Sequence, residues 1–267
     1  MHKVKFIEES HQYISDDDRE LISVSAFTEQ FKNKVDWNAI AKRVAASKTR
    51  NGEPTTTQEV LAKWERKRNI AASIGTKYHN FREIGDLDTL NFYNVKCDIV
   101  FCPIIDNYKH SIPINKLSNN AEYRELMIYD MDYMICGQAD KVIVVDKKIN
   151  IWDYKTDAEI NFKAFSSKWV EPAMLLHPLS HLEECNANIY SIKMSLYMYM
   201  LCKSNRGFLK PGDIILEHIH LKRNPNDDNL PVLDKDGHPI VLKIEKIKLP
   251  YRKKEVMAML ETINEKV

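Results

Sequence analysis

The feature that most constrains the fold is a dense run of strand-forming residues in the middle of the chain. These segments are rich in Ile, Val and aromatic residues and are separated by short polar breaks, and they cover residues 125–129, 133–136, 139–145 and 149–154. β-Branched and aromatic side chains pack well on a pleated, half-buried surface. Apolar residues at helical spacing occur before and after this region, at about 58–84 and 185–203. Together these patterns predict an α/β fold with a mixed central β-sheet flanked by helices.

The whole chain, residues 1–267, is predicted to be one domain, because it contains no repeat, no low-complexity tract and no defensible domain boundary. Its N-terminal part is predicted to be helical and basic, at about 25–85, after short strands and with Ser25 as the cap of a first helix. Residues of about 86–121 are predicted to be an irregular insertion. C-terminal to these, the pattern predicts strands at 214–221 and 241–247, a polar hairpin around 224–229 and a final helix after Pro250.

Glycine is scarce, with seven in 267 residues, and this scarcity excludes two phosphate-binding loops. No three glycines have the G-x-G-x-x-G spacing of a dinucleotide fold. The pair Gly207 and Gly212 has the spacing of a Walker A loop, but Asp213 follows it where that loop needs Lys. Phosphate groups, if the protein binds them, must therefore be held without a glycine cradle.

The overall charge is balanced, with 39 basic and 38 acidic residues, so only local patches can indicate a polyanionic partner. Between residues 39 and 70 there are eight Lys or Arg and three Glu. Two interpretations of this surplus remain open, a solvated helical face or a path for DNA. The basic residues predicted to contact DNA are Lys42, Arg43, Arg66, Lys67 and Arg68.

The cysteine pattern indicates a reducing, cytoplasmic setting. The five cysteines are odd in number and include no C-x-x-C pair. Acidic residues stand at 8, 9 and 16–18, where a targeting peptide would be basic and apolar. The longest nearly uncharged apolar stretch, 194–202, is too short to span a membrane, so no membrane partner is expected.

The central strands also place charged residues on one face. If Lys147 and Lys148 form a two-residue hairpin turn, Val142 lies opposite Asp153, and Asp140 and Lys155 project to the same side as Asp153. Two carboxylates at diagonal positions can reach one divalent cation. The alternative is a buried ion-pair cluster without metal, and a change of one residue in the turn would separate the two aspartates onto opposite faces.

An ordered set of motifs then resembles the PD-(D/E)XK nuclease superfamily, and most closely its RecB-like, phage-type exonuclease branch. Residues 75–79 (GTKYH) are similar to a G-x-x-x-H helix motif, residues 137–140 (GQAD) to G-x-x-D, and residues 153–156 (DYKT) to D-x-K-T. Residues 190–197 (YSIKMSLY) resemble the helix that usually carries Q-x-x-x-Y. The resemblance implies a restriction-endonuclease-like core.

The resemblance also implies a role for each motif residue. Asp140 and Asp153 would be carboxylate ligands of Mg²⁺ or Mn²⁺, together with the carbonyl oxygen of Tyr154. His79 would supply a nitrogen ligand, and imidazole favours tolerance of Mn²⁺. Lys155 would orient or help to deprotonate the attacking water and stabilise charge on the phosphate. Asp140, Asp153 and Lys155 would thus be the catalytic residues.

Several further residues are predicted around this centre. Glu125 matches an additional acidic position of the family, and Glu83 lies on the helical stripe of Gly75 and His79. Lys193 stands where the family usually has glutamine, whereas Tyr197, four residues later, is retained. Lysine cannot accept a hydrogen bond as an amide does, which places this part of the site in question. Ser25 belongs to an opening segment, 11–25, that is also similar to family members.

Two glycines have places in these motifs. Gly75 precedes His79 by about one helical turn, and Gly137 precedes Asp140 by three residues. In a chain this poor in glycine, their positions predict a close approach of metal, DNA or a neighbouring backbone. No cysteine follows Cys202, so the iron–sulfur cluster of some relatives is not expected.

The expected function is a metal-dependent deoxyribonuclease, acting as an exonuclease on single strands or DNA ends in a bacterial or phage-infected cell. Trp37, Trp64 and Tyr78 are candidates for base stacking, although each residue type is more often found in a core. A homo-oligomer and a helicase or recombination partner both occur in the superfamily, and both remain open. The alternatives are a catalytically silent DNA-binding module of the same fold and a metal-free interaction protein.

Overall fold

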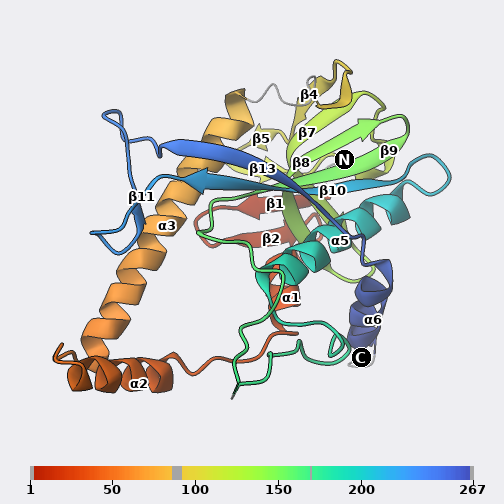
Figure 1. Cartoon of the computed structure of the whole chain (residues 1–267). Coiled ribbons are helices and arrows are strands. Elements are labelled where there is room, and N and C mark those ends of the chain that lie inside the picture. The colour runs from red at the N-terminus through yellow and green to blue at the C-terminus, as the bar shows by residue number, and fades with distance from the viewer. Residues whose placement is uncertain (1–2, 86–91, 169, 265–267) are drawn as a thin grey trace.

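The computed structural model describes residues 3–85, 92–168 and 170–264 and has an α/β fold with a large mixed sheet (Figure 1). The described strands are β1 (Val4–Ile7), β2 (Gln12–Ser15), β3 (Glu20–Ser23), β4 (Asp98–Phe101), β5 (Ile104–Ile105), β6 (Tyr108–His110), β7 (Ala121–Asp130), β8 (Ile135–Val145), β9 (Lys148–Lys155), β10 (Lys210–Leu221), β11 (Arg223–Asn224), β12 (Leu230–Pro231) and β13 (Val241–Leu249). The described helices are α1 (Val24–Glu29), α2 (Trp37–Arg50), α3 (Thr57–Gly85), the short 3₁₀ helix η1 (Ile114–Lys116), α5 (Asn186–Ser204) and α6 (Lys253–Asn264).

Among the described residues, eleven strands form one sheet in the order β13-β10-β9-β8-β3-β2-β1-β6-β5, and β7 and β4 extend it from β8. The pairs β9–β10, β3–β8 and β4–β7 are parallel, whereas β7–β8, β8–β9 and β10–β13 are antiparallel. The sheet is therefore mixed, as the sequence predicts. Helix α5 packs against β9 and β10. The C-terminal part of α3 packs on β9 and β10 through Ile74 and Tyr78, which share a buried cluster with Tyr154.

The central strands differ in detail from their predicted bounds. The segments 133–136 and 139–145 belong to one strand, β8, and β7 begins at Ala121 rather than at 125. The predicted insertion contains β4, β5 and β6, which pair with β7 and β1, so it extends the sheet instead of forming a loose excursion. Its residues 86–91 lie outside the described residues. Pro211 and Gly212, predicted as a connection, lie inside β10, where the pairing with β9 shifts its register.

The β8–β9 hairpin turns one residue earlier than predicted. Val145 pairs with Lys148 and Val142 with Ile151, so Asp146 and Lys147 form the two-residue turn. Both turn residues have positive φ, of 51° and 58°, as a type I′ turn requires. Because the loop keeps its length, each partner shifts by two residues and every side chain stays on its predicted face. Continuing the observed register places Asp140 opposite Asp153.

Burial explains why β8, β9 and α5 read as nearly continuous apolar segments. Val142, Val144 and Ile151 pack in the main core, which also contains the buried residues of α5. On the opposite face, Ile143 and Trp152 pack with residues 93–97. Strands covered on both faces become hydrophobic on both, in contrast to the alternating pattern of a half-exposed sheet.

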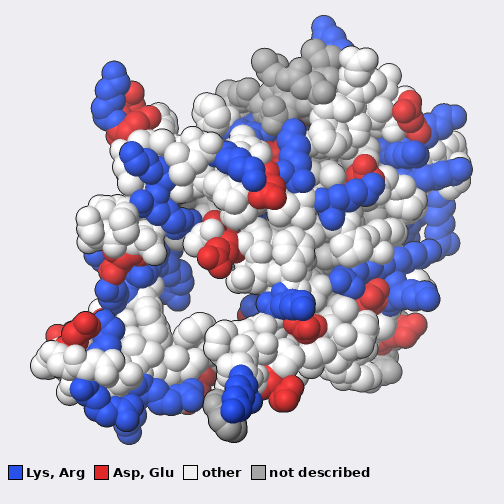
Figure 2. Space-filling model, in the orientation of Figure 1, with Lys and Arg blue, Asp and Glu red and all other residues white. Residues whose placement is uncertain are grey.

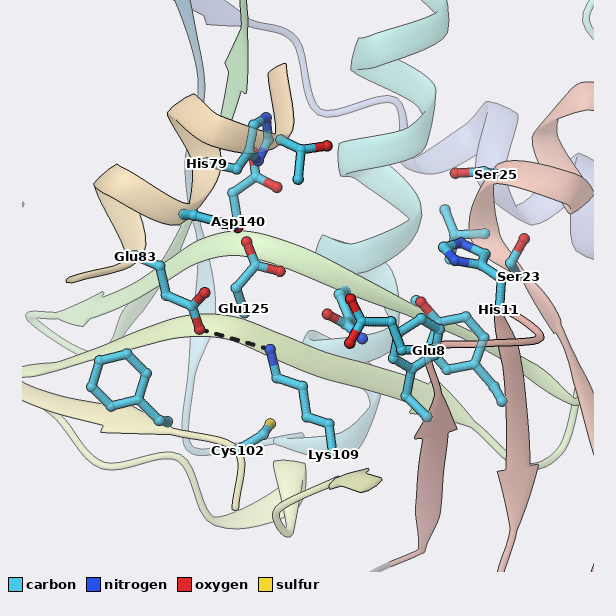
Figure 3. Close-up of a pocket in the computed structure, with 18 of the residues that line it drawn as sticks. Glu8, His11, Ser23, Ser25, His79, Glu83, Cys102, Lys109, Glu125 and Asp140 are labelled. Carbon is cyan, nitrogen blue, oxygen red and sulfur yellow. Dashed lines mark ion pairs between the residues drawn. The ribbon is translucent and has the colours of Figure 1, made fainter. Parts of the chain in front are cut away.

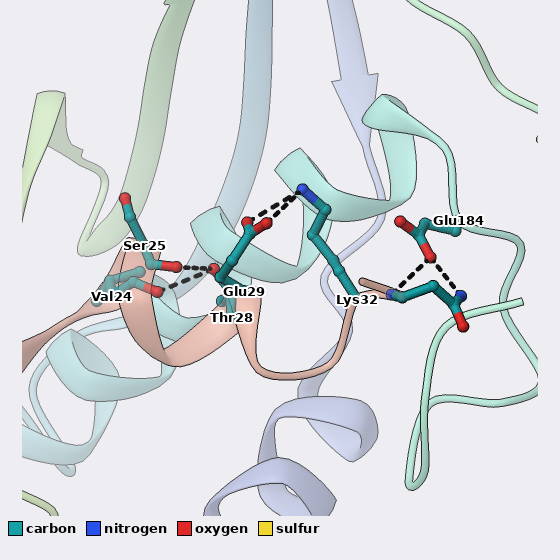
Figure 4. A network of polar contacts seen from close by, with 7 residues as sticks. Val24, Ser25, Thr28, Glu29, Lys32 and Glu184 are labelled. Atoms are coloured by element: carbon teal, nitrogen blue, oxygen red, sulfur yellow. Dashed lines mark hydrogen bonds and ion pairs between the residues drawn. The ribbon is translucent and has the colours of Figure 1, made fainter. Parts of the chain in front are cut away.

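Helix α1 begins two residues earlier in the chain than predicted. Ser23, not Ser25, is its N-cap, and the Ser23 hydroxyl accepts a hydrogen bond from the Ala26 N–H. The Thr28 hydroxyl donates to the carbonyl oxygens of Val24 and Ser25, at 2.9 and 3.0 Å (Figure 4). After the helix, the Asn33 N–H donates to Glu184 at 3.0 Å. The first bonds stabilise α1 itself, and the Asn33 bond connects the segment after α1 to the loop before α5.

Helices α2 and α3 form an arm that extends away from the sheet (Figure 1). Ala41 and Ala45 of α2 pack with Val60 of α3, and the rings of Trp37 and Trp64 lie 5.9 Å apart. Figure 2 shows an opening between this arm and the body of the molecule, with Lys and Arg side chains along the arm. Within the described part of the chain, no helix is both long enough and apolar enough to cross a membrane.

Candidate functional site

A cavity of about 860 Å³ opens where α1, α3, β7, β8 and α5 meet (Figure 3). Its lining includes seven residues predicted for the site, which are Ser25, His79, Glu83, Glu125, Asp140 and, on α5, Lys193 and Tyr197. Gly75 and Gly137 line it as well. Three of the four motifs, which are distant in the sequence, thus converge on one volume. Asp153 and Lys155, although on the same sheet face as Asp140, are not part of the cavity lining.

Asp140 is the residue that joins the other parts of the site. Its Oδ2 accepts a hydrogen bond from the Tyr154 N–H at 2.7 Å and lies 3.4 Å from His79 Nδ1. Burial alone would raise the pKa of Asp140, but His79, Lys155 and the Tyr154 N–H outweigh burial and hold this pKa below its usual value. Burial likewise lowers the pKa of His79, and the Asp140 carboxylate reverses that effect to a net increase.

Asp153 and Lys155 form an ion pair with little exposure, their side chains being 12% and 19% accessible. Lys155 Nζ also donates to the Tyr154 carbonyl oxygen at 3.1 Å. Burial lowers the pKa of Lys155, and the charges of Asp153 and Asp140 more than restore it, so the lysine is firmly protonated. The ammonium group therefore contacts two of the four groups that the resemblance assigned to a metal, the Asp153 carboxylate and the Tyr154 carbonyl.

Glu125, predicted only as a further acidic residue around the centre, lies among the potential metal ligands. It lies between Arg124, which pairs with Lys141, and Leu126, which pairs with Ala139, and this puts it opposite Asp140. Its φ of 48° is rare for a residue with a Cβ atom and marks local strain in β7. Burial, followed by the Asp140 charge, raises the pKa of Glu125 to about 7. In Figure 3 its side chain points toward Asp140 and His79.

Ligand atoms of His79, Glu125 and Asp140 all lie within 4.8 Å of one another, a grouping that could hold a metal ion. Two carboxylates and one imidazole are donors that suit Mn²⁺, and the carboxylates alone suit Mg²⁺. A divalent cation would also stabilise the two acids that burial brings together. The three donors His79, Glu125 and Asp140 therefore fit Mg²⁺ or Mn²⁺. Asp153 forms an ion pair with Lys155, and its role as a metal ligand stays a prediction.

The lysine that replaces glutamine lies in the cavity wall. Burial lowers the pKa of Lys193, partly offset by Asp153. Tyr197 is only 4% exposed, and its hydroxyl would lie 2.6 Å from a Cβ atom at Gly137. The predicted close approach at Gly137 therefore exists, but a tyrosine and the Val24 side chain make it. At Gly75 an added Cβ would meet Thr156 at an ordinary 3.7 Å, so no close approach occurs there.

Gln138 is a site residue that sequence reasoning missed. It precedes Asp140 by two residues on β8, lines the cavity, and its buried Nε2 has no hydrogen-bond partner among the described residues. A buried amide donor without a partner is costly and points to a ligand that can accept its hydrogen bond. The period of two along β8 could have found it, because residues two apart share a face.

The predicted insertion also supplies a cavity residue. Lys109 of β6 lies 3.9 Å from the Glu83 carboxylate, the ion pair dashed in Figure 3. Glu8 and His11, from the β1–β2 turn, complete that side of the cavity. Ser25 also lines the cavity, although it is not the cap of α1.

The residues predicted to contact DNA lie on the arm rather than in the cavity. Lys42 and Arg43 are exposed on α2, and Arg66, Lys67 and Arg68 lie on α3. The β11–β12 hairpin faces this part of α3: Asp228 pairs with Lys63 and lies 3.9 Å from Lys67, and Asp227 lies 3.5 Å from Arg66. Arg68 lies 3.7 Å from Glu65. The local basic surplus is thus partly neutralised by acids that are distant in the sequence.

The aromatic residues proposed for base stacking differ in their exposure to solvent. Trp37 is 60% exposed on the arm, against the edge of Trp64. Tyr78 is 5% exposed and lies with its ring edge against Tyr154, and its hydroxyl accepts a hydrogen bond from Arg82 at 2.8 Å. Tyr78 therefore belongs to the core and is not available for stacking.

Comparison with known proteins adds no family to this description: no family model matches the chain, and no curated protein is significantly similar to it.

Proposed function

We propose that the protein is a divalent-metal-dependent nuclease with a restriction-endonuclease-like core, which hydrolyses phosphodiester bonds in DNA, as an exonuclease on single strands or ends. The observation that carries the proposal is the convergence of Asp140, Glu125 and His79, from three different elements, beside the Asp153–Lys155 pair. Two acids and an imidazole that share one cavity, with a lysine beside it, are groups that suit metal-assisted phosphodiester hydrolysis.

In this proposal Asp140, Glu125 and His79 hold a Mg²⁺ or Mn²⁺ ion, with Asp153 as a further carboxylate. A bound divalent ion would lower the pKa of a water molecule and polarise the phosphoryl oxygen. Lys155, kept protonated by Asp153 and Asp140, supplies positive charge where the phosphate gains negative charge. The Tyr154 N–H fixes the orientation of the Asp140 carboxylate through its 2.7 Å hydrogen bond.

In this proposal, the opening between the arm and the body of the molecule receives the DNA substrate (Figure 2). Lys42 and Arg43 are exposed on the arm, and Trp37 presents an accessible ring beside them. A basic groove with exposed aromatic residues suits single strands, because phosphates contact the charges and bases stack on the rings. The Gln138 amide in the cavity supplies a donor for a phosphate or base oxygen.

A catalytically silent DNA-binding module of the same fold is the second candidate, and one observation favours it. Lys155 contacts Asp153 and the Tyr154 carbonyl, and Lys193, in the cavity wall, is a second amine close enough to interact with Asp153 and Asp140. Two amines beside the acids oppose the entry of a divalent cation by charge repulsion. The protein would then bind DNA through the arm without cleaving it.

The test is cleavage of end-labelled single- and double-stranded DNA by the full chain in Mg²⁺, Mn²⁺ or EDTA. Wild type is compared with Asp140→Asn, Asp153→Asn and Lys155→Ala. The matched control is Asp146→Asn, in the turn of the same hairpin, where Asn tolerates the positive φ. Circular dichroism of each variant shows whether the fold is retained, because breaking a buried ion pair also lowers stability.

We expect metal-dependent cleavage that the three site variants lose and Asp146→Asn keeps. DNA binding without cleavage in any metal would support the silent module. If the protein neither binds nor cleaves DNA, the proposal fails, and a metal-free interaction protein with an ion-pair cluster becomes the better interpretation.

A further inference from the structure

A second group of side chains that could bind a metal lies on β10 and on β13, the strand at one edge of the sheet. His218 and His220 of β10 and Glu245 of β13 have ligand atoms within 4.8 Å of one another. His218 and Glu245 are paired residues in the β10–β13 ladder, and His220 is two residues from His218 on the same strand. All three side chains therefore project to one face from two hydrogen-bonded strands, which hold their spacing.

The spacing of these atoms is close to that of a coordinated ion. His220 Nε2 lies 3.0 Å from Glu245 Oε2, and the rings of His218 and His220 have centroids 4.1 Å apart. Zn²⁺ takes nitrogen and oxygen ligands at about 2.0–2.1 Å, so two tetrahedral ligands are about 3.4 Å apart. Small side-chain rotations would bring the three donors to those positions without movement of the strands.

A hydrogen bond prepares His218 for this role. Its Nε2 lies 3.0 Å from the Asp157 carbonyl oxygen, and because a carbonyl only accepts, Nε2 must carry the hydrogen. The other ring nitrogen, Nδ1, then has a free lone pair. Metal-binding histidines commonly donate their second ring N–H to a backbone carbonyl in this way, which fixes the tautomer and the ring orientation.

The site is also open to solvent. A cavity of about 420 Å³ is lined by the three residues, by Ile247 and by residues 158–162. His218 is 5% exposed, whereas the His220 and Glu245 side chains are 33% and 43% exposed. Lys243 lies 3.3 Å from Glu245 but is 63% exposed, so it can turn into solvent when a cation binds. Three protein ligands beside an open cavity leave a fourth position for water.

We propose that His218, His220 and Glu245 bind a transition-metal ion of the Zn²⁺ class, at a site separate from His79, Glu125 and Asp140. Two imidazoles and one carboxylate favour Zn²⁺ over Mg²⁺, which prefers a shell of oxygen ligands. The site lies one strand away from the candidate active site, because His218 of β10 pairs with Lys155 of β9 in the parallel ladder. The proposal does not depend on nuclease activity.

The test is calorimetric titration of the untagged full chain with Zn²⁺, after removal of bound metals by a chelator. The wild type is compared with His220→Ala and with Glu245→Gln, a conservative change at an exposed position. His238→Ala is the matched control, because His238 is exposed on the loop between β12 and β13. His79→Ala separates this site from the first one. Titration with Co²⁺, whose visible absorption reports tetrahedral coordination, gives a second readout.

We expect wild type, His79→Ala and His238→Ala all to retain one Zn²⁺ equivalent that millimolar Mg²⁺ does not displace, whether or not a further equivalent binds at the first site. His220→Ala and Glu245→Gln should each weaken that binding at least about tenfold and remove the tetrahedral Co²⁺ spectrum. Unchanged Zn²⁺ binding in both variants, or a loss confined to His79→Ala, would overturn the proposal. A melting temperature measured without metal shows that each variant is folded, so a failed fold is not read as a lost site.

Discussion

Glu125 lies opposite Asp140 across the β7–β8 ladder, with a positive φ of 48° and its carboxyl group near both Asp140 and His79. The strained backbone turns an acid toward another acid in a largely buried place. Such an arrangement is unfavourable in the free protein, because like charges meet where water is scarce. A bound cation or a proton relieves it.

The first prediction concerns the pH dependence of stability in Glu125→Gln. Burial and Asp140 raise the pKa of Glu125 from 4.5 to about 7, so this carboxyl takes up a proton on folding between those pH values. Its contribution to stability is therefore present below pH 4.5 and is lost as the pH rises to about 7. Glutamine does not ionise, so the stability of the variant relative to wild type should be about 3 kcal/mol greater above pH 7 than below pH 4.5.

Urea unfolding in EDTA at pH 5 and pH 8 measures this difference, since all other titrating groups are common to both proteins. Glu20→Gln, at an exposed position on β3, is the control and should show no such trend. An equal difference between variant and wild type at the two pH values would contradict the expected pKa.

The second prediction compares two glycines near the site. In Gly137→Ala the new Cβ would lie 2.6 Å from the Tyr197 hydroxyl and 3.1 Å from Val24 Cβ, which forces the packing apart. We expect a loss of about 1–3 kcal/mol in the free energy of unfolding. In Gly75→Ala the nearest atom is at 3.7 Å, and alanine is the better helix former, so stability should stay equal or rise by up to about 1 kcal/mol. Thermal unfolding of both variants tests the contrast, and equal losses would show that the close approach is not the cause.

The third prediction separates binding from stability at Gln138. Its buried Nε2 has no partner among the described residues, so Gln138→Ala removes the desolvation cost of that donor, which offsets the packing lost with the side chain. We expect unfolding to be little changed, while affinity for single-stranded DNA falls about three- to tenfold. Gln12→Ala, which removes a surface bond to Glu20, is the control for both assays. A loss of stability with normal DNA binding would reverse the assignment.

The fourth prediction concerns the acids that face the basic arm. Asp228 pairs with Lys63 and lies near Lys67, so Asp228→Asn releases positive charge toward a phosphate backbone. Asn also tolerates the residue's φ of 55°. We expect DNA affinity to rise roughly two- to tenfold at low salt, with a steeper dependence on salt concentration. Fluorescence anisotropy over a salt series measures both quantities.

Asp17→Asn is the matched control for that experiment. It changes the net charge equally but disrupts an ion pair with Arg19 in the β2–β3 turn. If both variants raise affinity equally, the effect comes from net charge and not from the arm.

The sequence determined the elements of this protein and the order of its site residues. The apolar period predicted α3 and α5 nearly to the residue, and the strand-rich segment predicted the centre of a mixed sheet. The faces of Asp140, Asp153 and Lys155 were predicted correctly even with the hairpin turn misplaced, because a two-residue loop preserves the alternation of side chains. These features depend on the spacing of residues that are close in the sequence, so the sequence alone is enough to predict them.

Only the tertiary structure decided which charges meet. Glu125 joins Asp140 and His79, and Asp153 instead pairs with Lys155. Asp228 neutralises part of α3 from a hairpin far along the chain, and His218 meets Glu245 across two strands. These relationships depend on strand order, on one positive φ and on the distances between side-chain ends. Ionic and metal-binding chemistry acts over a few ångströms between residues that the chain separates widely, so local patterns do not encode it.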